Sequence, residues 1–376
     1  MTRTHALSIP AVAIALAHAS VQAQTVPSAP RPDISACTAI ESDRDRLACY
    51  DTIAKRAPST PAAADAAATQ AKQQEAALAA ERAASPRSDL YASESDSDDA
   101  IANAGKGSLL DRRWELAKGS KLGTWNFRAY KPVYLLPVFW TNQPNTLPHS
   151  PNPNNVVTTP QDLQKIEAKF QLSFKTKAIE NLFGDNGDVW MGYTQSSRWQ
   201  VYNSGNSRPF RETNYEPEVL LVFRTNYQIA GWKGRLAGIG VNHQSNGRAD
   251  PLSRSWNRVV TNIGFDRDNW SLMFRPWFRI PESSGKDDNP DIQDYMGRGD
   301  VTVVHTVGRN EFSLTARHSL RGGDRSHGAV QFDWGFPITR QLRGHFQLFD
   351  GYGESMIDYN HRATYIGLGV SLLEWY

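Results

Sequence analysis

The sequence predicts an all-β fold, a twelve-stranded antiparallel transmembrane β-barrel that carries an N-terminal helical or disordered periplasmic extension. Three observations lead to this fold class. From about Trp114 to the last residue, apolar and polar residues alternate with a period of two, as in strands with one apolar and one polar face. The connections between these strands are alternately long and short. After the N-terminal signal, the sequence has no run of about eighteen uncharged apolar residues, so we expect no membrane helix.

The composition sets broad limits on the class of protein. The chain has 376 residues, enough for one large domain with appendages, and 10% of them are aromatic, including 11 Trp. Such an aromatic content is compatible with the aromatic girdles of membrane barrels. The formal net charge of +2 argues neither for nor against a nucleic-acid partner, but the sequence has no long run of Lys and Arg to bind a phosphate backbone. We therefore expect no nucleic-acid partner.

Residues 1–23 have the pattern of a cleaved secretory signal peptide. Arg3 precedes an apolar stretch from about Ala6 to Ala17, and small residues lead up to Ala23. The apolar stretch is too short to span a bilayer as a helix. The mature chain is therefore expected to begin at Gln24 and to leave the cytoplasm.

Residues 24–112 differ in composition from the rest and are predicted to form a periplasmic extension and linker. Apolar residues within 40–55 have helical spacing, and the following segment is rich in Ala, Gln and Glu. That segment has little to bury, so it is either a solvated helix or a disordered spacer. In an oxidising compartment, Cys37 and Cys49 either form a disulfide, which we favour, or remain free thiols.

Residues 113–376 are predicted to form the barrel. From Glu167 to Lys177, alternate positions such as Phe170 and Leu172 are apolar, and most positions between them are polar. An antiparallel strand with two different faces explains this pattern. Similar alternation predicts about twelve strands, at 127–139, 167–177, 188–201, 216–227, 233–245, 255–266, 270–280, 295–307, 311–320, 328–336, 342–351 and 362–376.

The lengths of the connections distinguish a membrane barrel from a soluble sandwich. Long or Pro-, Asn-, Asp- and Gly-rich segments follow the first, third, fifth, seventh and eleventh strands, whereas DRDN and GRN are tight turns. Outer-membrane barrels have long outer loops and short periplasmic turns. The final strand ends on Tyr376, in register with its apolar face, and a terminal aromatic residue is typical of such barrels.

Three polar residues continue the apolar faces of the fifth and sixth strands. Val241 is followed at the same parity by His243 and Ser245, and Asn257 precedes Val259 on the sixth strand. A symmetric hairpin would place His243 opposite Asn257, with Cβ atoms about 5 Å apart, and Ser245 about 7 Å along the strand. The imidazole could therefore contact both neighbours on the lipid-facing side of the barrel.

The pattern alone leaves two interpretations of this trio open. Polar groups on a lipid-facing surface cost free energy unless they bond to each other, on the order of 1–3 kcal/mol for each unpaired group. A mutually bonded Ser, His and Asn also provides a nucleophile, a base and a residue that orients the base. Alternatively, the three residues belong to a polar girdle at the outer rim.

Longer motifs point to a known family. They are GYTQSSRWQ, SRPFRETNYEP, GIGVNHQSNGRADPLSRSWNR, DNPDIQDYMG and GYGESMIDYN. Through them, residues 114–376 resemble the outer-membrane phospholipase A family, the detergent-resistant phospholipases of Gram-negative bacteria. The resemblance implies a calcium-dependent outer-membrane enzyme, active as a homodimer, that hydrolyses acyl esters of glycerophospholipids at the A1 and A2 positions and of lysophospholipids. It does not cover the N-terminal region.

The resemblance also implies roles for individual residues. Ser245 is expected to be the nucleophile, His243 the general base and then acid, and Asn257 a neutral residue that holds the imidazole. The amide of Gly247 is expected to stabilise the oxyanion of the tetrahedral intermediate, together with Ca²⁺. The active site would lie on the outer-leaflet side of the membrane.

Calcium and dimer positions follow from the same resemblance. It implies Ca²⁺ ligands at Ser207, Arg248 and Ser253, with Ser207 reaching the active site of the neighbouring subunit. Arg248 would contribute its backbone carbonyl, because a guanidinium cannot ligate a cation. Gln195 matches a position in the dimer contact; alternatively, it lies in a solvated rim.

Other candidate residues have simpler interpretations. Asp250 is the carboxylate nearest the trio, but its place in the turn-forming sequence ADP favours a structural role. Residues 287–291 lack the spaced ligands of an EF-hand and are expected to form an outer loop. His305, His318 and His345 have no ligand spacing and are interpreted as ordinary barrel residues. The competing hypothesis for the whole protein is a passive pore or a structural barrel.

Overall fold

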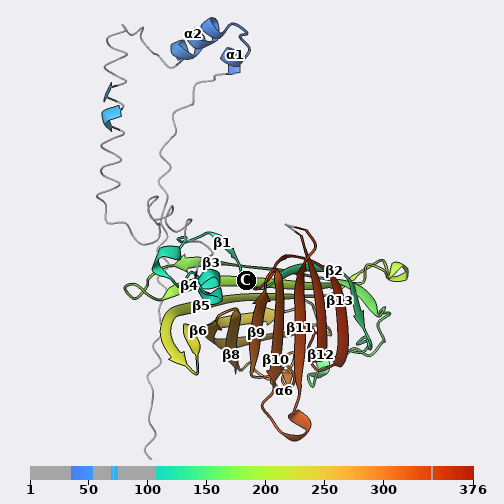
Figure 1. Cartoon of the computed structure of the whole chain (residues 1–376). Coiled ribbons are helices and arrows are strands. Elements are labelled where there is room, and N and C mark those ends of the chain that lie inside the picture. Colours follow the sequence, from blue (N-terminus) through green and yellow to red (C-terminus); the bar gives the residue numbers. More distant parts are fainter. Residues whose placement is uncertain (1–34, 54–68, 71, 75–106, 340–341) are drawn as a thin grey trace, which may run out of the picture. The chain divides into compact units, whose positions relative to one another are not determined.

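The computed structural model describes residues 35–53, 69–70, 72–74, 107–339 and 342–376 (Figure 1). The chain divides into two compact units, residues 1–85 and residues 86–376. The predicted signal peptide and most of the predicted linker lie outside the described residues. Within the described ranges, no helix is long and apolar enough to cross a membrane.

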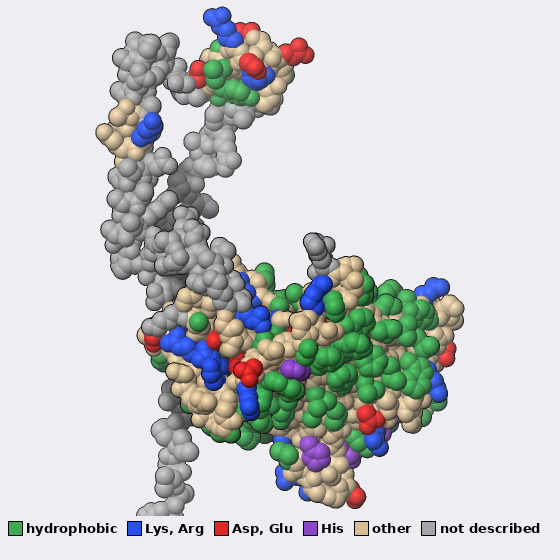
Figure 2. All heavy atoms as spheres, in the orientation of Figure 1, with side chains coloured by type: hydrophobic (Ala, Val, Ile, Leu, Met, Phe, Trp, Pro, Cys, Tyr) green, Lys and Arg blue, Asp and Glu red, His purple; other side chains and the backbone are tan. Residues whose placement is uncertain are grey.

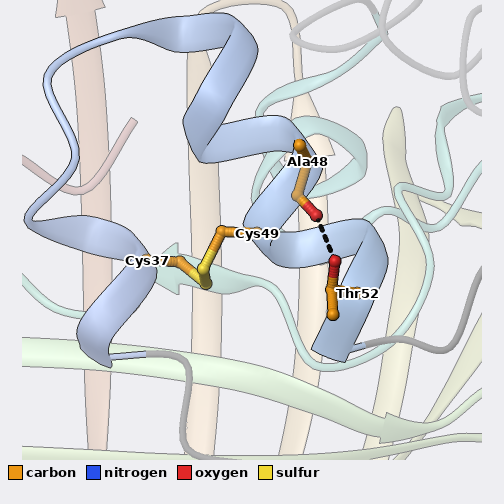
Figure 3. Close-up of a disulfide and its surroundings, with 4 residues drawn as sticks. All are labelled: Cys37, Ala48, Cys49 and Thr52. Carbon is orange, nitrogen blue, oxygen red and sulfur yellow. Dashed lines mark hydrogen bonds between the residues drawn. A yellow bond between two sulfur atoms is a disulfide. The ribbon is translucent and has the colours of Figure 1, made fainter.

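Two short helices are described in the N-terminal unit, α1 (Ser35–Thr38) and α2 (Asp43–Ile53). A disulfide joins Cys37 on α1 to Cys49 on α2 (Figure 3). The covalent bond holds the two helices together in a segment that provides few large apolar side chains for a core.

The second unit is built on one sheet that closes into a barrel (Figure 1). Its strands are β1 (Phe127–Ala129), β2 (Val133–Thr141), β3 (Ile166–Ile179), β4 (Asp188–Trp199), β5 (Phe210–Ile229), β6 (Trp232–Ser245), β7 (Ser255–Arg267), β8 (Trp270–Ile280), β9 (Gly299–Val307), β10 (Asn310–His318), β11 (Gly328–Pro337), β12 (Arg343–Tyr352) and β13 (Arg362–Leu373). Short helical segments are α5 (Leu109–Trp114), η1 (Lys118–Ser120), η2 (Pro153–Asn155), η3 (Ser204–Asn206), α6 (Ile292–Tyr295) and η4 (Gly323–Arg325).

The pairing of the strands confirms the predicted twelve-stranded antiparallel barrel. β1 and β2 are two segments of one interrupted strand, because both pair with β3. Each later strand pairs with the next in antiparallel fashion, and β13 pairs with β2, which closes the sheet.

Two strands begin several residues away from the predicted positions. The strand expected from Tyr295 begins at Gly299, because the residues before it form α6. Between them, Gly297 turns the chain with a φ of +90°, a conformation that favours glycine. β5 begins at Phe210 rather than Glu216, because its alternation of buried and more exposed residues extends that far.

The connections alternate in length as predicted. Long connections lie at one end of the barrel, at 142–165, 200–209, 246–254, 281–298, 319–327 and 353–361. Shorter turns lie at the other end, at 180–187, 230–231, 268–269, 308–309 and 338–342. The long connection at 319–327 was not recognised from the sequence. The end with the long connections is the outer end of an outer-membrane barrel.

The two faces of the barrel wall differ in polarity. On β3, Lys169 and Lys175 point inward and are buried, whereas Leu172 and Phe174 are 50% and 40% exposed on the outside. Figure 2 shows a broad hydrophobic outer surface over the later strands. This is the surface expected of a wall in contact with lipid.

A short helix and side chains from both ends fill the lumen. α5 packs against β6, β7 and β8 with Leu110 fully buried, and the Leu110 amide donates a hydrogen bond to the Asp266 carboxylate at 2.9 Å. From the outer end, Tyr359 and Ile292 are fully buried in the same apolar cluster as Leu110. Part of the predicted linker, residues 109–112, therefore packs as part of the barrel.

The C-terminal residues also turn into the barrel, contrary to the prediction for Tyr376. β13 ends at Leu373, and the Tyr376 hydroxyl lies 2.8 Å from the buried Ser271 hydroxyl instead of facing lipid. The backbone amide of Tyr376 donates to the Glu311 carboxylate at 3.0 Å. These polar partners lie inside the barrel, which accounts for the inward turn.

Candidate active site

The predicted trio lies where the hairpin of β6 and β7 reaches the outer rim. The pairing places His243 opposite Asn257 and Ser245 opposite Ser255, so the predicted register is confirmed. Asn242, on the other face of β6, is buried in the lumen. Because side chains alternate along a strand, the trio faces the outside of the barrel.

A chain of hydrogen bonds holds the imidazole of His243. Its Nδ1 lies 2.8 Å from Asn257 Oδ1, and Asn257 Nδ2 donates to Glu282 Oε1 at 3.1 Å. An amide oxygen can only accept a hydrogen bond, so the proton of the neutral imidazole is on Nδ1. Nε2 then carries the lone pair and can accept a proton.

Ser245 and Gly247 follow at the end of β6 and in the loop after it. Within the part of the chain that the structure describes, neither the Ser245 hydroxyl nor the Gly247 amide makes a hydrogen bond to the protein. Gly247 has a φ of +62°, and a β-carbon there would lie 3.1 Å from the Tyr215 ring. The expected hydrogen bond between Ser245 and His243 is therefore not made in the described structure, and only His243 and Asn257 are bonded to each other. A free hydroxyl and a free amide beside an imidazole are groups that acyl transfer requires.

An apolar groove of about 710 Å³ lies on the outer wall beside this trio. It begins at His243 and Asn257, crosses β5, β4 and β3, and ends beside Trp125 and Phe127. Between these ends its lining is mainly hydrocarbon, from Phe174, Met191, Tyr193, Pro217, Val219 and Val241. A surface of this kind can hold a hydrocarbon chain with its end near the imidazole.

Asp250 does not contact the imidazole. Its carboxylate accepts a hydrogen bond from Asn155 Nδ2 at 2.9 Å, in the loop between β6 and β7. The amide of Leu252 donates to the carbonyl of Ala249 at 3.0 Å and closes a turn around it. These contacts agree with the structural role expected for Asp250.

The expected calcium position consists of hydroxyl and carbonyl oxygens. The Ser253 hydroxyl donates to Asp288 Oδ2 at 2.6 Å, which leaves the lone pairs of the hydroxyl oxygen free for a cation. Within the described ranges, the Arg248 carbonyl accepts no hydrogen bond. Among the described residues, no three His, Cys, Asp or Glu side chains gather as a metal site. The all-oxygen set fits Ca²⁺ better than a softer metal.

Two predicted residues lie on other elements. Ser207 lies in the connection between β4 and β5 with a φ of +55°, and in the described structure no hydrogen bond joins it to Ser253 or Arg248. Gln195 on β4 faces outward, and its Oε1 accepts a hydrogen bond from the Tyr193 hydroxyl at 3.1 Å.

Two residues that the sequence did not single out as site residues contact the predicted ones: Glu282 bonds to Asn257, and Asp288 bonds to Ser253. Both lie in the connection 281–298, which was predicted only as an outer loop. The strand period identifies neighbours within a hairpin, but it does not show which residues of a long loop fold back on it. Glu282, just past the end of β8, could have been found from the pairing of β7 with β8.

The sequence matches the family described as Phospholipase A1 over residues 110–372. A relative from Neisseria meningitidis serogroup B is 37% identical over 352 residues, which cover 89% of each chain. The phospholipase A1 of Escherichia coli strain K12 is 41% identical over 212 residues, which cover 56% of this chain and 71% of that protein.

Solved structures with the same barrel are also similar. The outer membrane phospholipase A of Escherichia coli has a TM-score of 0.59 and 34% identity, covering 66% of this chain and 95% of that one. A Salmonella typhi outer membrane phospholipase, crystallised as a dimer with bound calcium, has a TM-score of 0.60 and 36% identity, with coverages of 67% and 94%. A third structure is of the Escherichia coli protein with an active-site asparagine replaced by alanine, at 35% identity and a TM-score of 0.59.

Proposed function

This chain belongs to the phospholipase A1 family, and we propose that it cleaves the acyl esters of glycerophospholipids with Ser245, His243 and Asn257 as its catalytic triad. It is an outer-membrane phospholipase. The observation that carries the triad is the outward-facing hydrogen bond of 2.8 Å between His243 and Asn257, next to an unbonded serine hydroxyl. A structural barrel has no use for such a group on its lipid-facing wall.

The proposed reaction begins with proton transfer from the Ser245 hydroxyl to Nε2 of His243. The serine oxygen attacks the acyl carbonyl, and the imidazolium then gives its proton to the departing glycerol oxygen. A water molecule cleaves the resulting acyl-enzyme, again with His243 as base. Asn257 keeps Nδ1 protonated and the ring in place; as a neutral amide it stabilises the imidazolium less than a carboxylate would.

The free amide of Gly247 is the proposed donor to the oxyanion of the tetrahedral intermediate. When bound, Ca²⁺ would supply further positive charge at that oxygen. Ser253 and the Arg248 carbonyl would hold the ion, with Ser207 supplied by a second subunit. A similar protein that was crystallised as a dimer with calcium supports this arrangement.

We propose that the groove beside His243 holds one acyl chain of the substrate. Its hydrocarbon lining offers few polar contacts that could select one ester position of the glycerol. We therefore include the A1 and A2 positions, and lysophospholipids, among the substrates. Gln195 is the proposed polar contact of the homodimer, where pairing with a second copy would satisfy it on a lipid-facing wall.

The alternative function, a passive pore, is less consistent with the structure. α5 and the outer connections bury Leu110, Ile292 and Tyr359 inside the lumen, where an open channel would be expected. The polar trio on the outer wall would also have no role in a pore.

Fatty-acid release from mixed micelles of a diacyl phospholipid, measured during a Ca²⁺ titration, tests the proposal. Ser245→Ala should lower the rate by at least about 10³-fold, because the nucleophile is lost. Thr261→Ala removes an outward hydroxyl from the neighbouring strand and should leave activity unchanged. Chelation of Ca²⁺ should silence the unmodified protein.

Folding of each variant is checked by the heat-dependent gel mobility typical of intact barrels. Full activity of a folded Ser245→Ala variant would contradict the triad. Ion conductance in planar bilayers without any hydrolysis would favour the pore.

A further inference from the structure

Another part of the outer wall carries a second, larger groove that the proposed reaction does not use. Its volume is about 1040 Å³, and it lies over β8 to β13, next to the long outer connections. The border of the groove farther from the outer end is a row of outward-facing apolar residues on neighbouring strands. They pair with each other across the sheet: Phe274, Val301, Ala316 and Val330. The groove is therefore an apolar hollow at the level of the outer leaflet.

Glycine makes this part of the wall hollow. In the next row toward the outer end of the barrel, Gly299 lies opposite Pro276, and Gly328 lies opposite His318. A β-carbon on Gly299 would be 2.9 Å from Pro276 Cα, and one on Gly328 would be 2.5 Å from the Arg317 carbonyl oxygen. Both positions exclude larger side chains, and two missing side chains leave space at the centre of the groove.

The edge of the groove nearest the outer end of the barrel is basic. Four nitrogen-bearing side chains lie along it, one at the outer end of each of four strands: Arg298, His318, His327 and Arg362. In Figure 2 the outer end of these strands points downward, and histidine and basic side chains lie there, below the hydrophobic surface. The side chain of Arg362 is 65% exposed, and within the described structure its Nε and Nη1 make no hydrogen bond.

Two carboxylates at this edge, Asp350 and Asp294, are already bonded. Asp300 also borders the groove, but it lies between two outward-facing residues of β9 and therefore points toward the lumen. Asp350 accepts hydrogen bonds from Arg362 at 3.1 Å and from the Thr364 hydroxyl at 2.6 Å. Asp294 lies 3.4 Å from the guanidinium of Arg298. A ligand with an ammonium group would therefore compete for carboxylates that are in use, whereas a ligand with an anionic group would meet free N–H donors.

We propose that this groove binds a lipid of the outer leaflet with a phosphomonoester headgroup. Its acyl chains would cover the apolar row, and its phosphate would accept hydrogen bonds from the N–H groups of Arg362 that Asp350 leaves free. The volume is at the upper end of the range for small-molecule sites, which suits more than one chain. The site is separate from the trio on β6 and β7.

Native mass spectrometry of the full chain in non-ionic detergent tests this site with two ether-linked lipids that a phospholipase cannot hydrolyse. A dialkyl phosphatidic acid should bind about tenfold more tightly than the matching phosphatidylcholine, because only the former lacks a headgroup ammonium. Arg362→Gln should remove this preference. Arg267→Gln, an exposed arginine at the opposite rim, is the matched control and should not.

Filling the groove gives a second, independent variant. Ala316→Phe should abolish binding of the dialkyl phosphatidic acid, whereas Leu314→Phe, on the same outward face but outside the groove, should not. If Ala316→Phe does not fold, Val330→Phe replaces it. Equal binding of the two lipids overturns the proposal. So does tight binding of inorganic phosphate that Ala316→Phe leaves unchanged, because that result would indicate a plain anion site.

Discussion

A charged cluster in the lumen and the polar trio on the outer wall are both removed from bulk water, but their hydrogen-bonding groups are satisfied to different degrees. In the lumen, the Glu354 carboxylate bonds to Arg198 at 2.7 and 2.9 Å and pairs with Lys169 at 2.7 Å. On the outer wall, His243 has one protein partner and the Ser245 hydroxyl has none in the described structure. The fully bonded cluster around Glu354 supports the fold, whereas the partly bonded trio remains available for substrate.

The largest effect on stability is expected from Glu354→Gln. This change leaves Arg198 and Lys169 buried without their counter-charge, and breaking a buried pair costs about 3–5 kcal/mol. The free energy of unfolding is measured by denaturant titration in lipid bilayers. Asp324→Asn, in an exposed loop, is the matched control and should change little. A Glu354→Gln barrel of unchanged stability would mean that the Glu354 cluster does not stabilise the fold.

Acid should weaken the same network. Burial alone would raise the pKa of Glu354, but the charges of Arg198 and Lys169 lower it from 4.5 to about 2. A depressed pKa stabilises the fold above pH 4.5, and this contribution is lost as the pH falls from 4.5 toward 2. The free energy of unfolding, measured at pH 7, 4.5 and 3, should therefore decrease as the pH is lowered. The decrease should be larger in the unmodified protein than in Glu354→Gln. If the unfolding free energies of the unmodified protein and of Glu354→Gln change in parallel with pH, the role of this carboxylate is contradicted.

On the outer wall, Asn257→Ala should reduce kcat by roughly 10- to 100-fold with little change in stability. Without Oδ1, the imidazole of His243 loses its orientation and the preferred position of its proton, but Ser245 and the groove remain. Steady-state hydrolysis of a micellar phospholipid at saturating Ca²⁺ measures the effect. An unchanged kcat would show that Asn257 does not orient the base.

The smallest effect is expected from Glu282, which acts only through Asn257. Glu282→Ala should lower kcat several-fold, because the amide of Asn257 can then rotate and present its NH₂ group to the imidazole. Glu282→Gln keeps an acceptor oxygen and should retain nearly full activity. If the two variants lose equal activity, the charge of Glu282 matters rather than its hydrogen bond.

The barrel and the register of the hairpin that carries the proposed triad could be predicted because strand parity is a local property of the sequence. His243 and Asn257 share the outward parity of Val241 and Val259, and a short-range hairpin fixes their pairing. The family motifs supplied the functional interpretation that parity left open.

Features that depend on long connections could not be predicted in this way. Asp288 reaches Ser253 from 35 positions away, through a loop without any repeating pattern. The inward turn of Tyr376 depends on Glu311 from another strand, so the parity of the last strand gave the wrong face. In the described structure Ser207 bonds to neither Ser253 nor Arg248, and the proposed contact with a second subunit is not a property that strand parity can predict.

The packed lumen also has an osmotic consequence. α5, Trp190, Trp256 and Tyr359 occupy the space through which solutes pass in an open barrel of similar construction. A cell could therefore store many idle copies in its outer membrane without weakening that membrane as a barrier. The amount of protein held in reserve would then be limited by the risk of lipid damage, not by leakage.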